Sequence, residues 1–335
     1  VELMDVVRLI EQKLGKKAEI EFLPMQPGDI PESLADIEKS EEFLGFKPTT
    51  GISSGIEDFV EWYKEYNRGQ IMQFIDLKTQ QEKIKTGIDA RIQTVLAHGK
   101  YIMGPEIKEF EQVLADFVGV KHCITCSSGT DALLMALMAW DIGPGDAVFT
   151  SPFTFIATAE VIQLLGAIPV FVDIDENTFT ISPVKLDEEI DRIKKEGRLT
   201  PKVIIPVDLF GLPANYPEID SISRKYDLLV LEDGAQGFGG SINGEMACSF
   251  GNMAATSFFP AKPLGCYGDG GAIFTHEDSL AEKLVSIRVH GKGDHKYDNV
   301  RGGINGRLDT LQAAILLEKM TIFPEEIRLR NVVAA

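Results

Sequence analysis

The segment LLVLEDGAQGFGG, Leu228 to Gly240, is the strongest indication of the fold, because a short apolar run ends in two adjacent acids. Such a run is typical of a buried strand. Glu232 and Asp233 would then lie at the carboxyl end of the strand, where open α/β sheets bind their ligands. Either acid could instead serve as a cap for a turn or a helix.

Further segments with strand and helix patterns alternate on both sides of this one. The predicted strands are residues 122–126, 147–151, 169–174, 202–209, 228–233 and 271–275. Helical patterns occupy residues 83–99, 105–119, 130–140, 158–166 and 216–226. Regular alternation of strands and helices favours a largely parallel sheet that is covered by helices on both faces. The predicted fold class is therefore α/β.

Composition excludes several classes of partner. The chain has 335 residues, is 44% hydrophobic and carries a formal net charge of −18. This acidic balance argues against a nucleic-acid-binding surface and against a basic membrane surface. No apolar run reaches the length of about 18 residues that a membrane-spanning helix needs. We therefore expect neither a nucleic-acid partner nor a membrane partner.

The four cysteines suggest a metal or redox site at first sight, because Cys123 and Cys126 form a C-x-x-C motif. Both lie in a predicted strand, however, and residues three apart on a strand point to opposite faces. Cys248 and Cys266 do not supply the second C-x-x-C pair of a zinc ribbon. We expect four structural thiols, no metal and a reducing, cytoplasmic location.

A phosphate-binding motif is suggested by the residues that follow the first predicted strand. Ser127, Ser128, Gly129 and Thr130 lead from that strand into a helix. Small residues at a helix N-terminus let backbone N–H groups approach an anion. The same residues are good helix caps in any protein, so the motif by itself leaves both interpretations open.

A lysine in an unusual setting lies in the segment SFFPAKPLGCYGDGG, Ser257 to Gly271. Burial beside apolar groups would lower the pKa of Lys262, and an aldehyde cofactor would then trap its amine as a Schiff base. A surface lysine is the alternative. The glycines that follow would let the backbone pass close to a ligand. In SPFTFIATAE, we expect Phe155 to lie on a cofactor ring and Phe153 to lie in the core.

Together these motifs resemble the DegT/StrS family of pyridoxal-phosphate sugar aminotransferases, which have fold type I. The resemblance runs from residue 72 to residue 330 and includes SSGTDAL, FTFIATAE, LEDGAQGFGG, FFPAKPLGCYGDGG and GINGRLDTLQAAIL. Within the family, the chain is most similar to the enzymes that aminate UDP-2-acetamido-2-deoxy-3-oxo-glucuronate. The resemblance implies a transaminase that moves an amino group from an amino acid, glutamate being the expected donor, to a UDP-linked 3-keto sugar for surface polysaccharides.

The resemblance also implies roles for individual residues. Lys262 would bind pyridoxal phosphate covalently and move the proton of the reaction. Asp233 would pair with the pyridinium nitrogen, Gln236 would contact the ring oxygen, and Phe155 would stack on the ring. The phosphate would be bound by Gly129, Thr130 and Ser257, and by Asn305 of a neighbouring subunit in a homodimer with shared active sites. The substrate would be lined by Gly99, Tyr101 and Arg307.

The first part of the chain has a separate resemblance. Two amphipathic helix patterns, residues 3–15 and 53–66, flank a segment rich in proline, glycine and acids. This part is similar to the C-terminal tail of UDP-glucuronate 4-epimerases. It has no G-x-G-x-x-G motif after a strand, and no tyrosine of the chain is followed four residues later by lysine. We expect an appendage without catalytic function.

The resemblances divide the chain into three parts: an epimerase-like tail (1–70), a cofactor-binding large domain (72–310) and the start of an incomplete small C-terminal domain (311–335). Family members continue for about 90 residues beyond the equivalent of Ala335. Ala261 stands where close relatives have serine.

Three alternatives stay open: a truncated fragment that binds the cofactor without catalysis, a sugar dehydratase of the same family, and an epimerase fragment. The dehydratases have histidine in place of Lys262, and the missing nucleotide motif counts against the third.

Overall fold

The computed structural model describes residues 3–21, 41–43, 45, 47, 49–68, 75–295 and 297–335. The chain divides into two compact units, residues 1–75 and 76–335, and each is described by itself. The predicted domain boundaries at residues 70 and 310 stay predictions. No helix of the described residues is both long and apolar enough to cross a bilayer.

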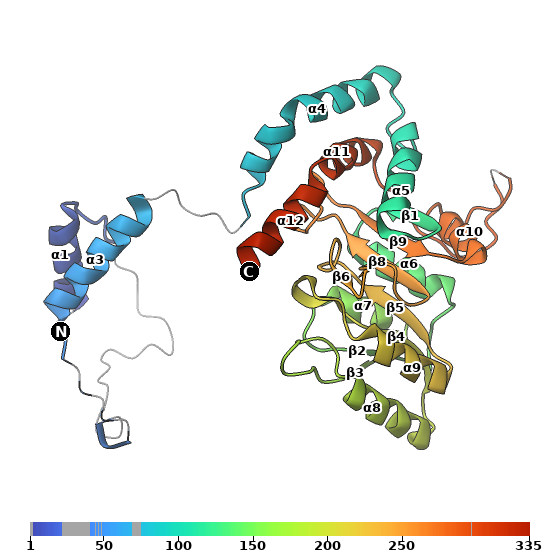
Figure 1. Cartoon of the computed structure of the whole chain (residues 1–335), viewed down its shortest axis with the longest axis horizontal. Coiled ribbons are helices and arrows are strands. Elements are labelled where there is room, and N and C mark those ends of the chain that lie inside the picture. The colour runs from blue at the N-terminus through green and yellow to red at the C-terminus, as the bar shows by residue number, and fades with distance from the viewer. Residues whose placement is uncertain are drawn as a thin grey trace. The chain divides into compact units, whose positions relative to one another are not determined.

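The first unit contains the helix pair α1 (Leu3–Leu14) and α3 (Ile52–Arg68) (Figure 1). Lys13 forms an ion pair with Glu57 at 2.5 Å, and the Nζ of Lys64 donates to the carbonyl of Lys13 at 2.6 Å. Residues 22–40, which carry much of the resemblance to an epimerase tail, lie outside the described residues. The epimerase resemblance therefore stays a prediction.

The second unit is built on a seven-stranded sheet with the order β1-β9-β8-β5-β4-β2-β3. β9 is antiparallel to both its neighbours, and every other pairing in this sheet is parallel. The carboxyl ends of β1, β2, β5 and β8 therefore meet at one edge of the sheet. The strands are β1 (His122–Cys126), β2 (Asp146–Thr150), β3 (Ile168–Phe171), β4 (Thr200–Ile205), β5 (Leu229–Asp233), β8 (Met253–Ser257) and β9 (Gly271–Thr275), beside a short ribbon of β6 (Ser241–Ile242) and β7 (Glu245–Met246).

Helices cover both faces of this sheet, as predicted (Figure 1). One core lies between the sheet and α6 (Gly129–Ala139), α7 (Ala157–Leu164) and α10 (Asp278–Ile287). The cores on the other face involve α5 (Pro105–Val118), α8 (Pro183–Glu196), α9 (Tyr216–Tyr226) and α11 (Thr310–Met320). α4 (Leu77–His98) packs on α11, which is followed by α12 (Phe323–Ala334). The predicted α/β class is confirmed.

The two cysteines of β1 show how a strand directs residues that are close in sequence to opposite faces of the sheet. Cys123 and Cys126 lie in the cores on opposite faces of the sheet, as their spacing on β1 predicts. All four cysteines are buried and free, and burial raises the pKa of Cys126 to about 12. These thiols therefore contribute apolar packing.

The interior strand β8 has no counterpart among the predicted strands. Its sequence, MAATS, consists mostly of small residues and lacks the branched apolar run from which the other strands were predicted. Burial between β5 and β9 supplies what the local pattern does not. Without β8, the sequence pattern does not explain why Ser257 lies at the carboxyl edge of the sheet, where open α/β sheets bind their ligands.

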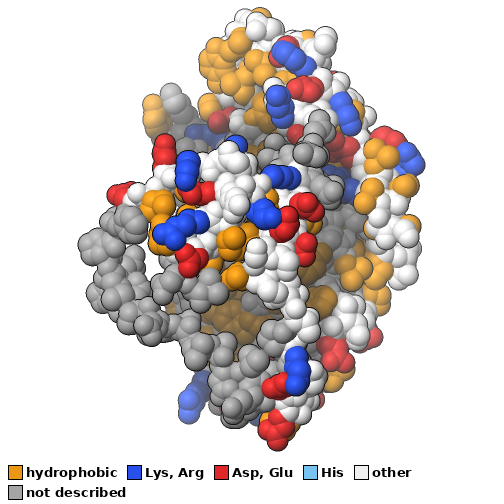
Figure 2. Space-filling view, turned by 90° about the vertical axis from the view of Figure 1, so that its left-hand side faces the viewer, with side chains coloured by type: hydrophobic (Ala, Val, Ile, Leu, Met, Phe, Trp, Pro, Cys, Tyr) orange, Lys and Arg blue, Asp and Glu red, His pale blue; other side chains and the backbone are white. Residues whose placement is uncertain are grey.

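Charged side chains of the described residues are mixed on the face shown in Figure 2. Lysine and arginine side chains lie beside acidic ones rather than apart from them. A nucleic-acid-binding surface would instead gather basic side chains on one face. The visible face thus has no such basic patch among the residues described.

Candidate active site

The candidate site lies where β1 and β8 end and β9 begins, side by side in the sheet. Gly271, the first residue of β9, pairs with Cys126 at the end of β1 and with Ser257 at the end of β8. A Cβ atom on Gly271 would lie 2.4 Å from the carbonyl oxygen of Ser128, and a Cβ atom on Gly129 would lie 2.6 Å from the Cβ of Ser257. Glycine at both positions therefore lets the start of α6 approach β8 closely.

This close approach forms an anion cradle. The side chain of Ser128 caps α6 by accepting from the N–H of Asp131 at 3.0 Å. The first N–H groups of a helix have no partner within it, so those of Gly129 and Thr130 can donate to an anion. The Oγ of Ser257 accepts from the N–H of Phe259 at 3.2 Å, which leaves its own proton to donate. These three donors suit a phosphate.

Two of the glycines after Lys262 are needed for close packing within the chain, and not for the close approach to a ligand that was expected. A Cβ atom on Gly265 would lie 2.3 Å from the carbonyl oxygen of Pro260, and one on Gly270 would lie 2.9 Å from the side chain of Leu308. These glycines let the chain pack closely on itself around the lysine turn, rather than on a ligand.

Asp233 ends β5 at the same edge and is buried. Its Oδ2 accepts from the hydroxyl of Thr158 at 2.7 Å, and its Oδ1 accepts from the N–H of Ala235 at 3.2 Å. Burial raises the pKa of Asp233, while these hydrogen bonds and the charge of Lys262 oppose the rise. The site therefore holds a buried carboxylate that a further cation would stabilise.

Lys262 lies in the turn after β8, where its own N–H donates to the carbonyl of Phe259 at 2.8 Å. The side chain is half-buried. Burial lowers the pKa of Lys262, and the smaller effect of the Asp233 charge raises it. A lowered pKa increases the fraction of free amine, which is the nucleophilic form.

The aromatic residues after β2 line the same edge. Phe155 is 67% exposed, in agreement with a ring that is free to cover a ligand. The expectation that Phe153 lies in the core is wrong: its side chain is 45% exposed and packs edge-on against Phe179 and Phe210, with ring centroids 6.1 and 6.2 Å away. The loop after a strand that ends at the sheet edge places both phenylalanines outside the core.

Gln236 follows Asp233 by three residues. Its Oε1 accepts from the N–H of Phe210 at 3.0 Å, so its amide NH₂ group remains available to donate to a ligand oxygen. Phe210 has a positive φ of 57°, an uncommon conformation for a residue other than glycine. Gln236 thus also holds a strained turn in place.

The residues predicted to line the substrate lie in two neighbouring segments. Gly99 ends α4, and the carbonyl of Tyr101 accepts from the N–H of Thr310 at 3.0 Å. Arg307 is half-buried, and its Nε has no hydrogen-bond partner among the described residues. Asn305 is exposed and forms a bridge with Val289. The N–H of Ser127 donates to the carbonyl of Gly306, so this second segment adjoins the phosphate cradle.

The sequence pattern does not single out Thr158, although this residue belongs to the same FTFIATAE motif as Phe155. Because Thr158 lies at the start of the helix that follows the predicted strand 147–151, its hydroxyl could be expected near the carboxyl edge of the sheet. Glu232 does not join the site, because neighbouring residues on a strand point to opposite faces. Its carboxylate instead accepts from the N–H groups of Cys248 and Phe250.

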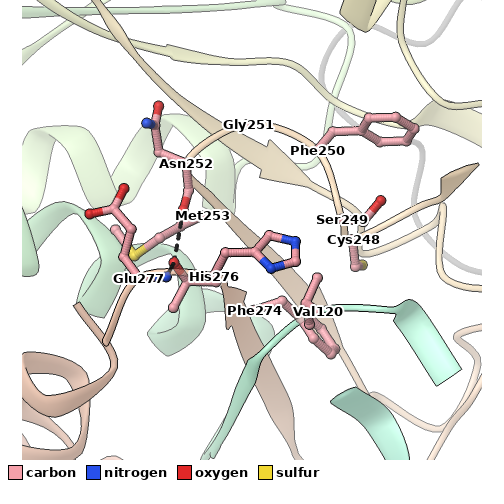
Figure 3. Close-up of a pocket in the computed structure, with 11 residues that line it drawn as sticks. Val120, Cys248, Ser249, Phe250, Gly251, Asn252, Met253, Phe274, His276 and Glu277 are labelled. Carbon is pink, nitrogen blue, oxygen red and sulfur yellow. Dashed lines mark hydrogen bonds between the residues drawn. The ribbon is translucent and has the colours of Figure 1, made fainter. Parts of the chain in front are cut away.

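A hollow lies at the opposite edge of the sheet from the candidate site, where β8 begins and β9 ends (Figure 3). It is lined by Val120, residues 248–253 and residues 274–277. Within it, the hydroxyl of Thr275 donates to the carbonyl of Asn252 at 3.0 Å. None of the predicted site residues lines this hollow, so it is separate from the candidate active site.

The candidate site fits pyridoxal phosphate. The cradle at α6 suits its phosphate, and the buried Asp233 carboxylate suits the protonated ring nitrogen. Lys262, with a lowered pKa and the charge of Asp233 acting on it, suits the aldehyde. Fold and site together define a pyridoxal-phosphate-dependent enzyme.

Comparison with known proteins gives the family. Residues 82–335 match the DegT/DnrJ/EryC1/StrS aminotransferase family. The chain is 54% identical over 267 residues to UDP-2-acetamido-2-deoxy-3-oxo-D-glucuronate aminotransferase of Pseudomonas aeruginosa, which covers 79% of this chain and 72% of that protein. The chain belongs to this aminotransferase family, and its cofactor is pyridoxal phosphate.

Solved structures that resemble this chain support the same family assignment. A DegT/DnrJ/EryC1/StrS aminotransferase from Brucella abortus is 54% identical with a TM-score of 0.78, over 78% of this chain and 70% of that one. NtdA from Bacillus subtilis, solved with the bound cofactor PMP, is 34% identical with a TM-score of 0.65, over 72% of this chain and 54% of that one. The chain spans 64% and 63% of the length of two further curated relatives.

Proposed function

We propose that the chain transfers an amino group from an amino acid, with glutamate as the expected donor, to a UDP-linked 3-keto sugar. The name of the Pseudomonas relative specifies such a sugar, and the identity of 54% supports the same substrate class here. The observation that carries the reaction type is the half-buried Lys262 near Asp233. Burial lowers the pKa of Lys262, and the charge of Asp233 raises it by a smaller amount. The product would be an amino-sugar nucleotide for a surface polysaccharide.

Each side chain at the cofactor has a distinct task. When bound, pyridoxal phosphate supplies an aldehyde that takes up the amino group and a ring that accepts the electrons of the broken C–H bond. Asp233 holds the proton on the ring nitrogen, and the amide of Gln236 donates to the ring oxygen. Phe155 covers one face of the ring. Lys262, as a free amine, would take the proton from the substrate carbon and deliver it to the cofactor carbon that carried the aldehyde, and would reverse this transfer in the second half-reaction.

The phosphate and the sugar nucleotide occupy the ends of the site. Gly129, Thr130 and Ser257 bind the phosphate of the cofactor. Arg307, whose Nε is buried without a partner among the described residues, would pair with a carboxylate or phosphate of the sugar nucleotide. Gly99 and Tyr101 would line the same side of the substrate.

A homodimer with shared sites is part of this proposal. The exposed amide of Asn305 would donate to the phosphate in a neighbouring subunit, and the exposed ring of Phe155 would become covered. Subunit complementation tests the sharing. Lys262→Ala and Asn305→Ala homodimers should each be inactive, whereas mixed dimers should regain activity because one of their two sites carries neither change. Mixed dimers without activity would contradict a shared site.

The reaction type is tested by adding glutamate to the chain loaded with pyridoxal phosphate. We expect the visible absorption band of the lysine-bound cofactor to bleach, and the amino group to be recovered on the cofactor by chromatography. A band that glutamate leaves unchanged would favour a fragment that binds the cofactor without catalysis.

A further inference from the structure

Asp208 is a buried acid behind the candidate site that none of the steps above uses. Its side chain is fully buried in the loop between β4 and α9. Its Oδ1 accepts from the N–H of Ala214 at 3.0 Å and from the hydroxyl of Tyr216 at 2.8 Å. Its Oδ2 is buried and has no hydrogen-bond partner among the described residues. One acceptor atom of this carboxyl group is therefore unsatisfied unless a proton is present.

Glu232 supplies the second half of the cluster. Its side chain is fully buried and lies close enough to that of Asp208 for the two carboxyl groups to influence each other's ionisation. Both its oxygens accept backbone N–H groups: one from Cys248 and, at 2.8 Å, one from Phe250, which are labelled in Figure 3. None of the ion pairs found among the described residues includes Asp208 or Glu232. Two carboxyl groups thus share one buried space without a compensating cation.

Two charged carboxylates in this space would repel each other. Burial raises the pKa of both carboxyl groups above their usual range. The other titratable groups that face the pair are Tyr216, Cys248 and Asp233, and none of them brings positive charge. Such a coupled pair binds one proton at neutral pH, as a property of the pair.

The hydrogen-bond inventory indicates which atom donates. Both oxygens of Glu232 already accept from N–H groups, which suits a carboxylate. The Oδ2 of Asp208 lacks any other partner. We propose that Asp208 and Glu232 share one proton at neutral pH, donated from Asp208 Oδ2 to Glu232, and that this bond positions Asp233 and Gln236 for the cofactor.

The positioning follows from what Asp208 contacts. Its N–H donates to the carbonyl of Asp233 at 3.1 Å. A Cβ atom on Gly237 would lie 2.7 Å from its Oδ2, so the backbone directly after Gln236 rests on this carboxyl group. Gln236 in turn holds Phe210, two residues after Asp208. The positioning role rests on the proposed function, whereas the shared proton does not.

Two isosteric variants separate the roles of the two acids. Asp208→Asn keeps the accepting oxygen and puts an amide donor in place of the O–H, so it should leave the affinity for pyridoxal phosphate within about twofold. Glu232→Gln must turn its NH₂ group toward a backbone N–H, so it should weaken that affinity by about tenfold or more. Glu218→Gln, at an exposed acid on α9, is the matched control and should change nothing.

The shared proton is measured on the full chain without cofactor. Infrared spectroscopy at neutral pH should show the C=O stretch of a protonated carboxyl group, and Asp208→Asn should lose it. The pair holds one proton that the unfolded chain releases at neutral pH, so stability falls as pH rises. Between pH 6 and 8, the unfolding constant of the original chain should rise about tenfold more per pH unit than that of Asp208→Asn.

The outcomes separate the two parts of the proposal. A carboxyl band that persists in Asp208→Asn, or equal pH slopes in the two proteins, would refute the shared proton. Equal losses of cofactor affinity in Asp208→Asn and Glu232→Gln would refute the direction of donation, and unchanged affinity in both variants would refute the positioning role. If no form of the chain binds pyridoxal phosphate, the proposed function and the positioning fail, while the infrared band still decides the shared proton.

Discussion

Replacing Thr158 by valine removes one hydrogen bond at the candidate site while preserving the shape of the side chain. The hydroxyl of Thr158 donates to Asp233 Oδ2 at 2.7 Å in a buried setting. A hydrogen bond to a charged group contributes about 1.5–3 kcal/mol. Since one pKa unit corresponds to about 1.4 kcal/mol, the pKa of Asp233 should rise by about 1–2 further units.

The consequence is a shift in the pH dependence of cofactor binding. The pKa of Asp233 is already raised by burial, and its carboxylate form is the one that holds the ring nitrogen. Affinity for pyridoxal phosphate is therefore present above that pKa and is lost as pH falls through it. In Thr158→Val, this loss should occur about 1–2 pH units higher. Spectroscopic titration with pyridoxal phosphate across a pH series measures it.

Thr154→Val is the matched control. The hydroxyl of Thr154, in the loop just before α7, lies 2.9 Å from that of Thr158, whereas among the described residues it has no hydrogen bond to Asp233. This control should shift the profile much less than Thr158→Val does. Coincident profiles for Thr158→Val and the original chain would refute the idea that this hydroxyl keeps Asp233 ionised.

Three further changes have expected outcomes. Lys262→Ala should abolish the visible band of protein-bound cofactor without lowering the melting temperature, which absorption and calorimetry check; a retained band would contradict the assignment. Gly271→Ala puts a Cβ atom 2.4 Å from the carbonyl oxygen of Ser128 and should cost about 1–3 kcal/mol of unfolding free energy in a denaturant titration. Burial lowers the pKa of Lys319 from 10.5 to about 8, so Lys319→Met should raise the unfolding free energy at pH 7 by about 2–3 kcal/mol. That gain should shrink between pH 8 and 10.5, where the folded lysine has lost the proton that the unfolded one keeps; a gain independent of pH would refute the buried charge.

The sequence predicts most of the sheet because its strands have strong local patterns. Leu228–Asp233 and His122–Cys126 are apolar runs with clear ends, and the structure contains both strands with bounds that differ by at most one residue. β8 escapes prediction because its small residues are buried by neighbours on both sides, which no local pattern records. Phe153 was assigned to the core for its apolarity alone, whereas the end of β2 places it at the rim.

The candidate site shows the same division between local and long-range information. Lys262 and Asp233 were selected from segments that are unusual by themselves. The contact of Thr158 with Asp233 joins residues 75 positions apart, and that of Asp208 with Glu232 joins the loop after β4 to the neighbouring strand β5. Such contacts arise from strand order and register, which the local sequence does not contain.

Chemical trapping of the cofactor lysine tests the central claim most directly. The full chain is loaded with pyridoxal phosphate, reduced with borohydride, digested and analysed by mass spectrometry. Lys262 has the buried Asp233 beside it, and Lys319 is the competing amine with a lowered pKa. The account predicts the reduced cofactor on the peptide that contains Lys262. Its recovery on Lys319, or on many surface lysines in equal amounts, would contradict the account.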